Sequence, residues 1–261
     1  MKFSIFAHYR LLFNNTKLRI LIGIDDTDNK DSRGTGYLAR TMGAEINARN
    51  LGTLISITRH QLYVHPEIAY TSQNSSACLE IKTNDFKTLQ SFCREFLLLR
   101  SAEGSDAGLC IVEPSTIPQS VIEWGKSCKD TVRQKIDAEN LASANSIYLE
   151  GLTGEKIGII GSLAAVGLRK SGNDGRFIWM DGKNLRELEG TYSVSELIKK
   201  TSIDNIETIN GQKPLENELI DVGNWVRPVW KDYKKVFYIE ENNHENIKWK
   251  AVAKEYIRTI S

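Results

Sequence analysis

Apolar and polar residues follow one another along the first 180 positions in a pattern that predicts alternating strands and helices. Residues 18–24 (LRILIGI) form a largely apolar run, which is typical of a central strand covered on both faces. Further strands are expected over TLISITRHQLYV, SACLEIK, GLCIVE, SIYLEGL and GRFIWM. This order of elements predicts an α/β to α+β fold in which helices flank a mixed sheet.

Apolar residues that recur every three or four positions predict the helices between these strands. One helix is expected after the GTG at 34–36, with Leu38, Met42 and Ile46 on one face. A second follows the capping candidates Thr83, Asn84 and Asp85. A third is expected through STIPQSVIEWGKSCKDTVRQKI, where one face carries Val121, Gly125, Cys128 and Val132. A fourth, KIGIIGSLAAVGLRK, is rich in small residues.

Beyond about residue 200 the pattern changes to short aromatic and basic segments such as NWVRPVWKDYKKVFYIEE, with a last helix near AVAKEYI. We therefore expect an N-terminal extension over 1–16, a main domain over 17–200 and a strand-rich C-terminal segment over 201–261. No repeat and no long Gly, Ser or Pro linker marks a boundary.

Composition excludes several function classes. The chain has 34 Lys and Arg against 33 Asp and Glu, so its net charge of +1 gives no overall attraction to nucleic acid or anionic membranes. No apolar run approaches the roughly 20 residues needed to span a bilayer, and the N-terminal segment lacks a secretory pattern. Four widely spaced cysteines, without zinc-ligand spacing, indicate reduced and mostly buried thiols. A cytoplasmic protein is expected.

The segment GIDDTDNKDSRGTG, residues 23–36, places four aspartates within seven residues directly after the first strand. Carboxylates repel one another and are costly to bury, so the cluster requires water, hydrogen-bond donors or a cation. We expect the strand to end near Asp25, which places Asp25, Asp26 and Asp28 at the start of the loop. Mg²⁺ takes one or two carboxylates together with substrate phosphates, and a helix N-terminus after Gly34, Thr35 and Gly36 suits a phosphate.

Other interpretations of this loop remain open. Aspartate is a turn former, so the loop is also consistent with a solvated turn that caps the next helix. A haloacid-dehalogenase phosphatase would need Thr or Val where Lys30 stands, and an actin-like or sugar-kinase hairpin is matched only loosely. A P-loop ending at Gly125 is rejected because Ser120 replaces the required upstream glycine.

Two further segments have both a functional and a structural interpretation. Glycines in TGEKIGIIGSLAAVG, among them Gly158 and Gly161, let a helix approach either a ligand or the sheet closely. Aromatic and basic side chains interleave downstream and suit single-stranded RNA, although an amphipathic edge strand has the same pattern. These residues are Trp225, Arg227, Trp230 and Lys231.

Taken together and in order, IGIDDTD, GTGYLA, HPEIAYTSQNSSA and IGIIGSLAAVG resemble the archaeal tRNA(Ile) agmatinylcytidine synthetase family, TiaS. The resemblance spans roughly residues 20 to 200. It implies a kinase-like ATP-binding domain, allows for a ferredoxin-like part, and implies phosphoryl transfer in tRNA modification with ATP and magnesium as cofactors. In that family ATP activates a cytidine carbonyl, and agmatine then displaces the activated oxygen.

By this likeness Asp25, Asp26 and Asp28 are the catalytic and metal-binding residues. The nucleotide-binding positions would be Gly34, Thr35, Gly36, Thr71, Asn74, Gly158 and Gly161. Phosphoryl transfer depends on positioning and charge neutralisation, which acids, a metal and a Gly-Thr loop supply.

The sequence also departs from the family. Only the central threonine of the family's C-T-T segment remains, and the arginine and glycine of its T-R-G-N segment are replaced by Ser72 and Gln73. The family's oligonucleotide-binding fold and zinc ribbon have no counterpart in these 261 residues, so a stand-alone ATP/Mg²⁺ platform is expected.

We therefore expect an ATP- and Mg²⁺-dependent phosphotransferase or activating enzyme that acts on an unidentified, tRNA-related acceptor. The alternative is a non-catalytic RNA- or protein-binding module that retains the fold, and a phosphatase is a third. The partners expected are a nucleotide and RNA, and no membrane is expected. The sequence does not determine the oligomeric state.

Overall fold

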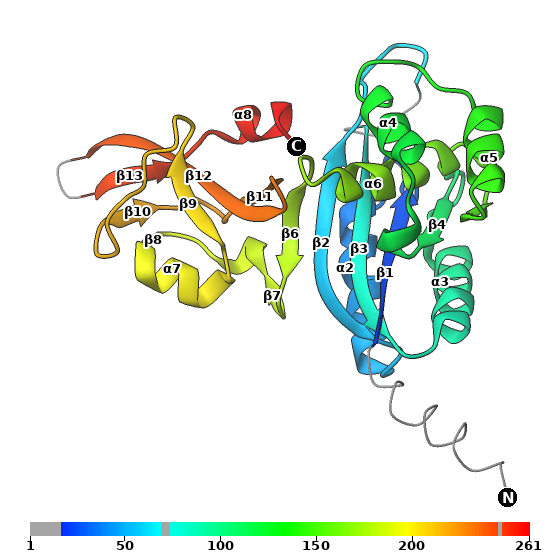
Figure 1. Ribbon diagram of the computed structural model, residues 1–261, viewed down its shortest axis with the longest axis horizontal. Helices are drawn as coiled ribbons and strands as arrows, with labels where there is room; N and C mark the ends of the chain where they lie inside the picture. The colour runs from blue at the N-terminus through cyan, green and yellow to red at the C-terminus, as the bar shows by residue number, and fades with distance from the viewer. Residues whose placement is uncertain (1–16, 69–73, 245–246) are drawn as a thin grey trace, which may run out of the picture.

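The computed structural model describes residues 17–68, 74–244 and 247–261. These residues form one open sheet of 13 strands, mostly antiparallel, and seven α-helices (Figure 1). The strands are β1 Leu18–Asp25, β2 Thr53–Gln61, β3 Ser75–Thr83, β4 Gly108–Val112, β5 Tyr148–Gly151, β6 Arg176–Met180, β7 Lys183–Asn184, β8 Thr191–Ser193, β9 Asn205–Thr208, β10 Leu219–Asp221, β11 Val229–Lys231, β12 Lys234–His244 and β13 Ile247–Ala251. The helices are α2 Thr35–Ala48, α3 Phe86–Arg100, α4 Gln119–Ser127, α5 Lys135–Ala144, α6 Ile159–Ser171, α7 Val194–Thr201 and α8 Lys254–Thr259.

The strand order is β5-β4-β1-β3-β2-β6-β11-β12-β13-β10-β8, with β7 on β6 and β9 on β12. Pairing of β2 with β6 joins an α/β half to a β-rich half (Figure 1). The fold class expected from the sequence is confirmed. Both neighbours of β1, which are β3 and β4, run antiparallel to it. Ligand sites of open α/β sheets usually lie at the carboxyl ends of parallel strands, so that rule does not apply to the end of β1.

The strand β1 is buried on both faces, as its apolar run predicts. Ile20, Ile22 and Ile24 pack with α2 and α3 in one core, while Leu21 packs with α4, α5 and α6 in a second. Because side chains alternate along a strand, Gly23 and Asp25 lie on the same face as Leu21. Asp25 therefore faces α6.

The β-rich half surrounds a third core that extends from Phe177 to Trp249. This core includes Val194 and Leu197 as well as Ile203 and Ile206, on either side of residue 200. The division of the chain at residue 200 stays a prediction. The extension expected over 1–16 also stays a prediction, because it lies outside the described residues.

Two details of the expected elements were wrong. The helix expected through STIPQSVIEWGKSCKDTVRQKI ends at Ser127, and Val132 lies in the following loop, while α5 is a separate helix. Strand β11, which carries Trp230, is paired on both sides and is no edge strand. In the described part of the chain, no helix is long and apolar enough to cross a membrane.

A buried ion pair connects α6 to the middle of the sheet. Glu80 on β3 accepts hydrogen bonds from Arg169 on α6 (2.7 Å) and from Arg19 on β1 (2.5 Å). The Arg169 guanidinium also lies 4.1 Å from the centroid of the Trp230 ring, and the Trp230 indole N–H donates to the Arg169 carbonyl. These contacts hold the helix whose first turn reaches the candidate site.

Candidate active site

Strand β1 ends at Asp25, as expected, and the first turn of α6 lies directly on that residue. A Cβ atom at Gly161 would lie 1.8 Å from the Asp25 Oδ2, and one at Gly23 would lie 2.0 Å from the Ser162 carbonyl oxygen. A Cβ atom at Gly158 would lie 2.8 Å from the Asp25 carbonyl oxygen. The glycines thus permit α6 to pack closely on β1, and this approach partly desolvates the Asp25 carboxyl.

The acidic loop that follows is held by its own side chains and by its neighbours. Asp26 adopts the left-handed conformation at φ 51°, which turns the chain away from β1. Asp28 accepts hydrogen bonds from the backbone N–H (2.9 Å) and the hydroxyl (2.7 Å) of Thr35 at the start of α2. The Thr27 carbonyl accepts a hydrogen bond from the backbone N–H of Ala102. Capping of α2 by Asp28 agrees with the structural interpretation of the loop.

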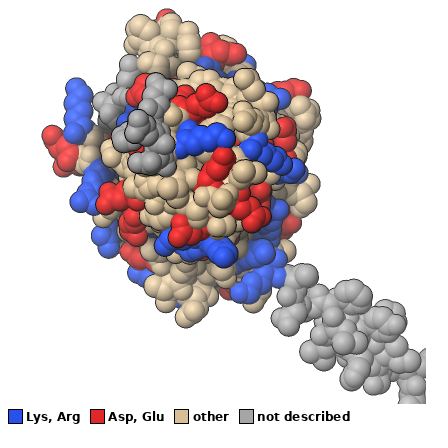
Figure 2. Space-filling model, turned by 90° about the vertical axis from the view of Figure 1, so that its left-hand side faces the viewer, with Lys and Arg blue, Asp and Glu red and all other residues tan. Residues whose placement is uncertain are grey.

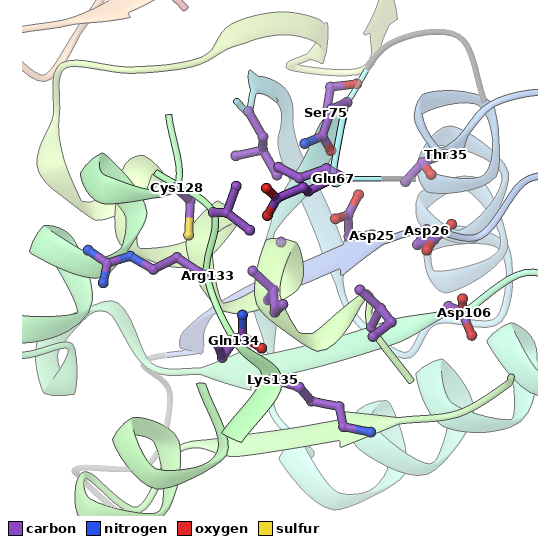
Figure 3. A pocket seen from close by; sticks show the side chains of 18 of the residues that line it. Asp25, Asp26, Thr35, Glu67, Ser75, Asp106, Cys128, Arg133, Gln134 and Lys135 are labelled. Carbon is purple, nitrogen blue, oxygen red and sulfur yellow. The ribbon is translucent and has the colours of Figure 1, made fainter. Parts of the chain in front are cut away.

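The three aspartates line one cavity of about 520 Å³, a volume in the range of small-molecule sites. In Figure 3, Asp25, Asp26 and Asp106 lie on one side of this cavity, and Gln134 and Lys135 approach from another. The wall combines the end of β1, the start of α2, the first turn of α6 and the loop before α5. It includes Thr35, Glu67, Asn74, Ser75, Arg133, Gly158 and Gly161.

Burial and like charges perturb the two first carboxyl groups. Desolvation, followed by the charge of Asp26, raises the pKa of Asp25 from 3.8 to about 8. Desolvation, followed by the charges of Asp106 and Asp28, raises the pKa of Asp26 to about 6. A pair of neighbouring carboxyl groups with raised pKa values is a feature of functional sites.

We expect the ligand-free protein to lose stability as the pH rises from 6 to 8. The folded protein keeps the Asp25 proton up to a pH of about 8, whereas the unfolded chain loses it near pH 3.8. The free energy of unfolding should therefore fall by up to about 1.4 kcal/mol per pH unit from this group. Urea denaturation at pH 6, 7 and 8 without divalent cations should show a flatter pH slope for Asp25→Asn. Equal slopes in both proteins would contradict this assignment, and Asp31→Asn serves as the control.

The residues present fit a divalent cation that is shared with a phosphate. No cluster of three or more His, Cys, Asp or Glu side chains arranged to hold a metal ion occurs within 17–68, 74–244 and 247–261. Mg²⁺ needs only one or two carboxylates when phosphates and waters complete its octahedron. Asp25 and Asp26 are suited to this because a cation would offset the desolvation and the repulsion that raise their pKa values.

A second cavity of about 420 Å³ adjoins the first and shares Asp28, Thr35 and Ser75 with it. Its wall also includes Gly34, Gly36 and Tyr37 from the start of α2. Four arginines complete the lining: Arg33, Arg40, Arg59 and Arg186.

The structure brings most of the predicted positions to one place. Asp25, Asp26, Asp28, Thr35, Asn74, Gly158 and Gly161 line the first cavity, whereas Gly34 and Gly36 line the second. Asn74 also holds the chain just after β2. Its side-chain amide donates to the Tyr63 backbone carbonyl, and its backbone carbonyl accepts from the Leu62 backbone N–H. Thr71 lies outside the described residues, as do Ser72 and Gln73.

The residues proposed for RNA are divided between two environments. The Trp225 ring lies 4.2 Å from the guanidinium of Arg186 and 4.6 Å from that of Arg227. Trp230 instead packs against Phe177 and Arg169 in the third core, and Lys231 is exposed. Trp225 and Arg227 are therefore together, while Trp230 has a packing role.

Sequence reasoning missed four charged residues of the first cavity. Asp106 precedes β4, Glu67 lies after β2, and Arg133 and Lys135 lie in or next to the loop before α5. Asp106 accepts a hydrogen bond from the Glu155 backbone N–H, and the Lys135 ammonium donates to the Glu155 carbonyl. These residues meet through tertiary packing, which local sequence patterns do not reveal. The one signal in the sequence was that Asp106 adjoins a predicted strand.

Comparisons with known proteins support the fold. No family model matches the chain. An uncharacterized protein of Methanocaldococcus jannaschii is 32% identical over 158 residues, which are 58% of this chain and 50% of that protein. The chain therefore spans about half the length of the curated relative that it matches.

Among solved structures, a tRNA fluorescent labeling enzyme is 25% identical, with a TM-score of 0.51 over 57% of this chain and 36% of that one. The complex of TiaS with an isoleucine tRNA and ATP is 24% identical, with a TM-score of 0.51 over the same shares. The complex of TiaS with that tRNA, AMPCPP and agmatine is 18% identical, with a TM-score of 0.50 over 77% of this chain and 52% of that one. The chain has a TiaS-like fold.

Proposed function

We propose that the first cavity binds ATP together with Mg²⁺ and that the domain uses the γ-phosphate to phosphorylate or activate an acceptor. The observation that carries this proposal is the meeting of Asp25, Asp26 and Asp106 around one cavity that also contains Lys135. Solved structures with a similar fold are described as complexes with ATP and AMPCPP, which supports a nucleotide as the ligand.

The roles of the residues follow from their positions. Asp25 and Asp26 would hold the cation, which when bound supplies neutralisation of phosphate charge. Asp28 orients Thr35 and so sets the start of α2 beside the phosphates. Lys135 would supply a positive charge to the phosphate oxygens, because its side chain lines the cavity and its ammonium is held by a neutral backbone carbonyl. No nucleophilic side chain of the protein is required for phosphoryl transfer.

RNA is the second candidate ligand, because the similar structures are described as complexes with a tRNA. The observation within this chain is that Arg186 and Arg227 both lie against the Trp225 ring, which combines a stacking surface with positive charge. In this alternative the domain is a non-catalytic module that binds RNA.

Calorimetric titration of ATP with and without Mg²⁺ tests the proposal. We expect ATP to bind only when the cation is present. We also expect turnover of ATP labelled at the γ-phosphate, which is measured with the protein alone and with total RNA added. Absence of any cation-dependent binding by the wild-type protein would overturn the proposal. Binding of RNA without nucleotide binding would favour the non-catalytic module.

A further inference from the structure

Basic side chains prevail in the lining of the second cavity, whereas acidic side chains prevail in that of the first. Four guanidinium groups line it, from the loop before α2 (Arg33), from α2 (Arg40), from β2 (Arg59) and from the turn after β7 (Arg186). Both halves of the molecule contribute, because α2 and β2 belong to the α/β half and Arg186 to the β-rich half.

None of these four arginines forms an ion pair with an acidic side chain in the described part of the chain. Aromatic rings and neutral oxygens hold them instead. The guanidinium carbons of Arg33 and Arg186 lie 4.5 Å and 4.2 Å from the ring centroids of Tyr37 and Trp225, respectively. Arg40 donates to the Gly36 carbonyl, and Arg59 donates to the Ser75 hydroxyl. A ring occupies only the face of a guanidinium and leaves N–H groups at its edge for an anion.

A further buried arginine, Arg176 on β6, lies opposite Arg59 on β2, so the excess of positive charge extends into the protein. Arg176, at the start of β6, is 5% exposed, and its Nη1 is buried with no hydrogen-bond partner among the described residues. Burial, together with the charges of Arg59 and Arg227, lowers the pKa of Arg176 to about 9. Burial and the charge of Arg186 likewise lower the pKa of Arg40 to about 10. All of these groups stay charged at neutral pH, and an anion would relieve their repulsion.

We propose that the second cavity binds a small molecule that carries at least one carboxylate or phosphate group. Resting on the proposed function, we infer further that this anion is the acceptor substrate. Its anionic end would contact Arg40, Arg59 and Arg186, and its reactive end would reach the wall at Asp28 and Thr35 that both cavities share. Guanidinium groups bind carboxylate and phosphate oxygens through the same paired hydrogen bonds, so carboxylates and phosphates belong to one ligand chemistry.

Size and charge distribution favour a small anion over RNA. A volume of about 420 Å³ accommodates a small molecule rather than a length of polynucleotide. RNA-binding proteins usually present a basic stripe on their surface. No such stripe crosses the face of the β-rich half that Figure 2 shows, where Lys and Arg are interspersed with Asp and Glu. A cationic amine such as agmatine is disfavoured here because the arginines would repel it.

Thermal unfolding of the full chain, titrated at constant ionic strength and without ATP or Mg²⁺, tests the proposal. The probes are citrate for carboxylates, glycerol 3-phosphate for phosphates, glycerol as the neutral control and a single-stranded 20-nucleotide RNA. We expect citrate or glycerol 3-phosphate to raise the unfolding midpoint in a saturable manner and glycerol to leave it unchanged. The double variant Arg40→Gln/Arg186→Gln should raise the apparent Kd of that anion by at least about 10-fold.

Controls separate this site from the first cavity and from general charge effects. Arg94→Gln, an arginine on α3 paired with Glu150, should leave anion binding unchanged. Asp26→Asn should weaken cation-dependent ATP binding about 100-fold yet leave anion binding intact, so failure of one proposal is distinguishable from failure of the other. Stabilisation by neither anion, or equal stabilisation of the double variant, would overturn the proposal. Tight RNA binding that the double variant abolishes, without any effect of the small anions, would overturn it in favour of RNA.

Discussion

The variant Asp26→Asn is expected to bind ATP with Mg²⁺ about 100-fold more weakly than the wild type, a loss of about 2.7 kcal/mol. Asp26 lines the cavity beside Asp25, and the charges of Asp106 and Asp28 act on it. An amide has the same shape but no negative charge, so it is a weaker ligand of Mg²⁺ than a carboxylate is.

This substitution is cleaner than the others in the loop. Asp26 has a left-handed backbone at φ 51°, which Asn tolerates as well as Asp does. Asp28→Asn would instead disturb the hydrogen bonds that begin α2. Asp31→Asn is the matched control, because Asp31 is exposed in the same loop and lines neither cavity.

Calorimetry of the three proteins with ATP, at saturating Mg²⁺ and with a chelator, provides the measurement. Asp31→Asn should bind as the wild type does. Wild-type affinity in Asp26→Asn, with an unchanged unfolding midpoint, would show that this carboxylate holds no cation.

The variant Glu80→Gln is expected to lose about 3–5 kcal/mol of stability, because it leaves the buried Arg169 guanidinium without a compensating charge. Glu80 and Arg169 are 3% and 6% exposed, and their side chains are 2.7 Å apart. The Arg169 guanidinium also donates to the Ser56 hydroxyl, so the pair joins α6 to both β2 and β3. Loss of the charge should loosen α6 and thereby the first turn that lies on Asp25.

Urea denaturation measures this effect. Glu45→Gln provides a comparison, because Glu45 pairs with the exposed Arg49 at 2.8 Å on the surface of α2. That pair should contribute about 0.5 kcal/mol. The double variant Glu80→Gln/Arg169→Met should be less destabilised than Glu80→Gln alone, since it removes the unpaired charge together with its partner. Similar losses in Glu80→Gln and Glu45→Gln would contradict a stabilising role of the buried pair.

The local pattern of the sequence was sufficient for most elements of the α/β half. The apolar run before Asp25, the helical face of Leu38, Met42 and Ile46, and the cap at Asp85 all appear at the predicted positions. These features depend on side-chain periodicity and on hydrogen bonds between near neighbours, which the sequence contains directly. The break between α4 and α5 was missed because the stretch keeps an apolar periodicity through Val132, although the helix ends at Ser127.

The acidic loop, the end of β1 and the glycine-rich helix could all be identified from local sequence patterns. Long-range packing places Gly161 against Asp25, brings Asp106 to the same cavity, and makes Arg40, Arg59 and Arg186 line the cavity adjacent to it. Arg59 and Arg186 are more than 120 residues apart in the chain. No periodicity relates residues that far apart; antiparallel pairing of β2 with β6 brings their segments together. Burial then sets the charge balance on which both proposed sites depend.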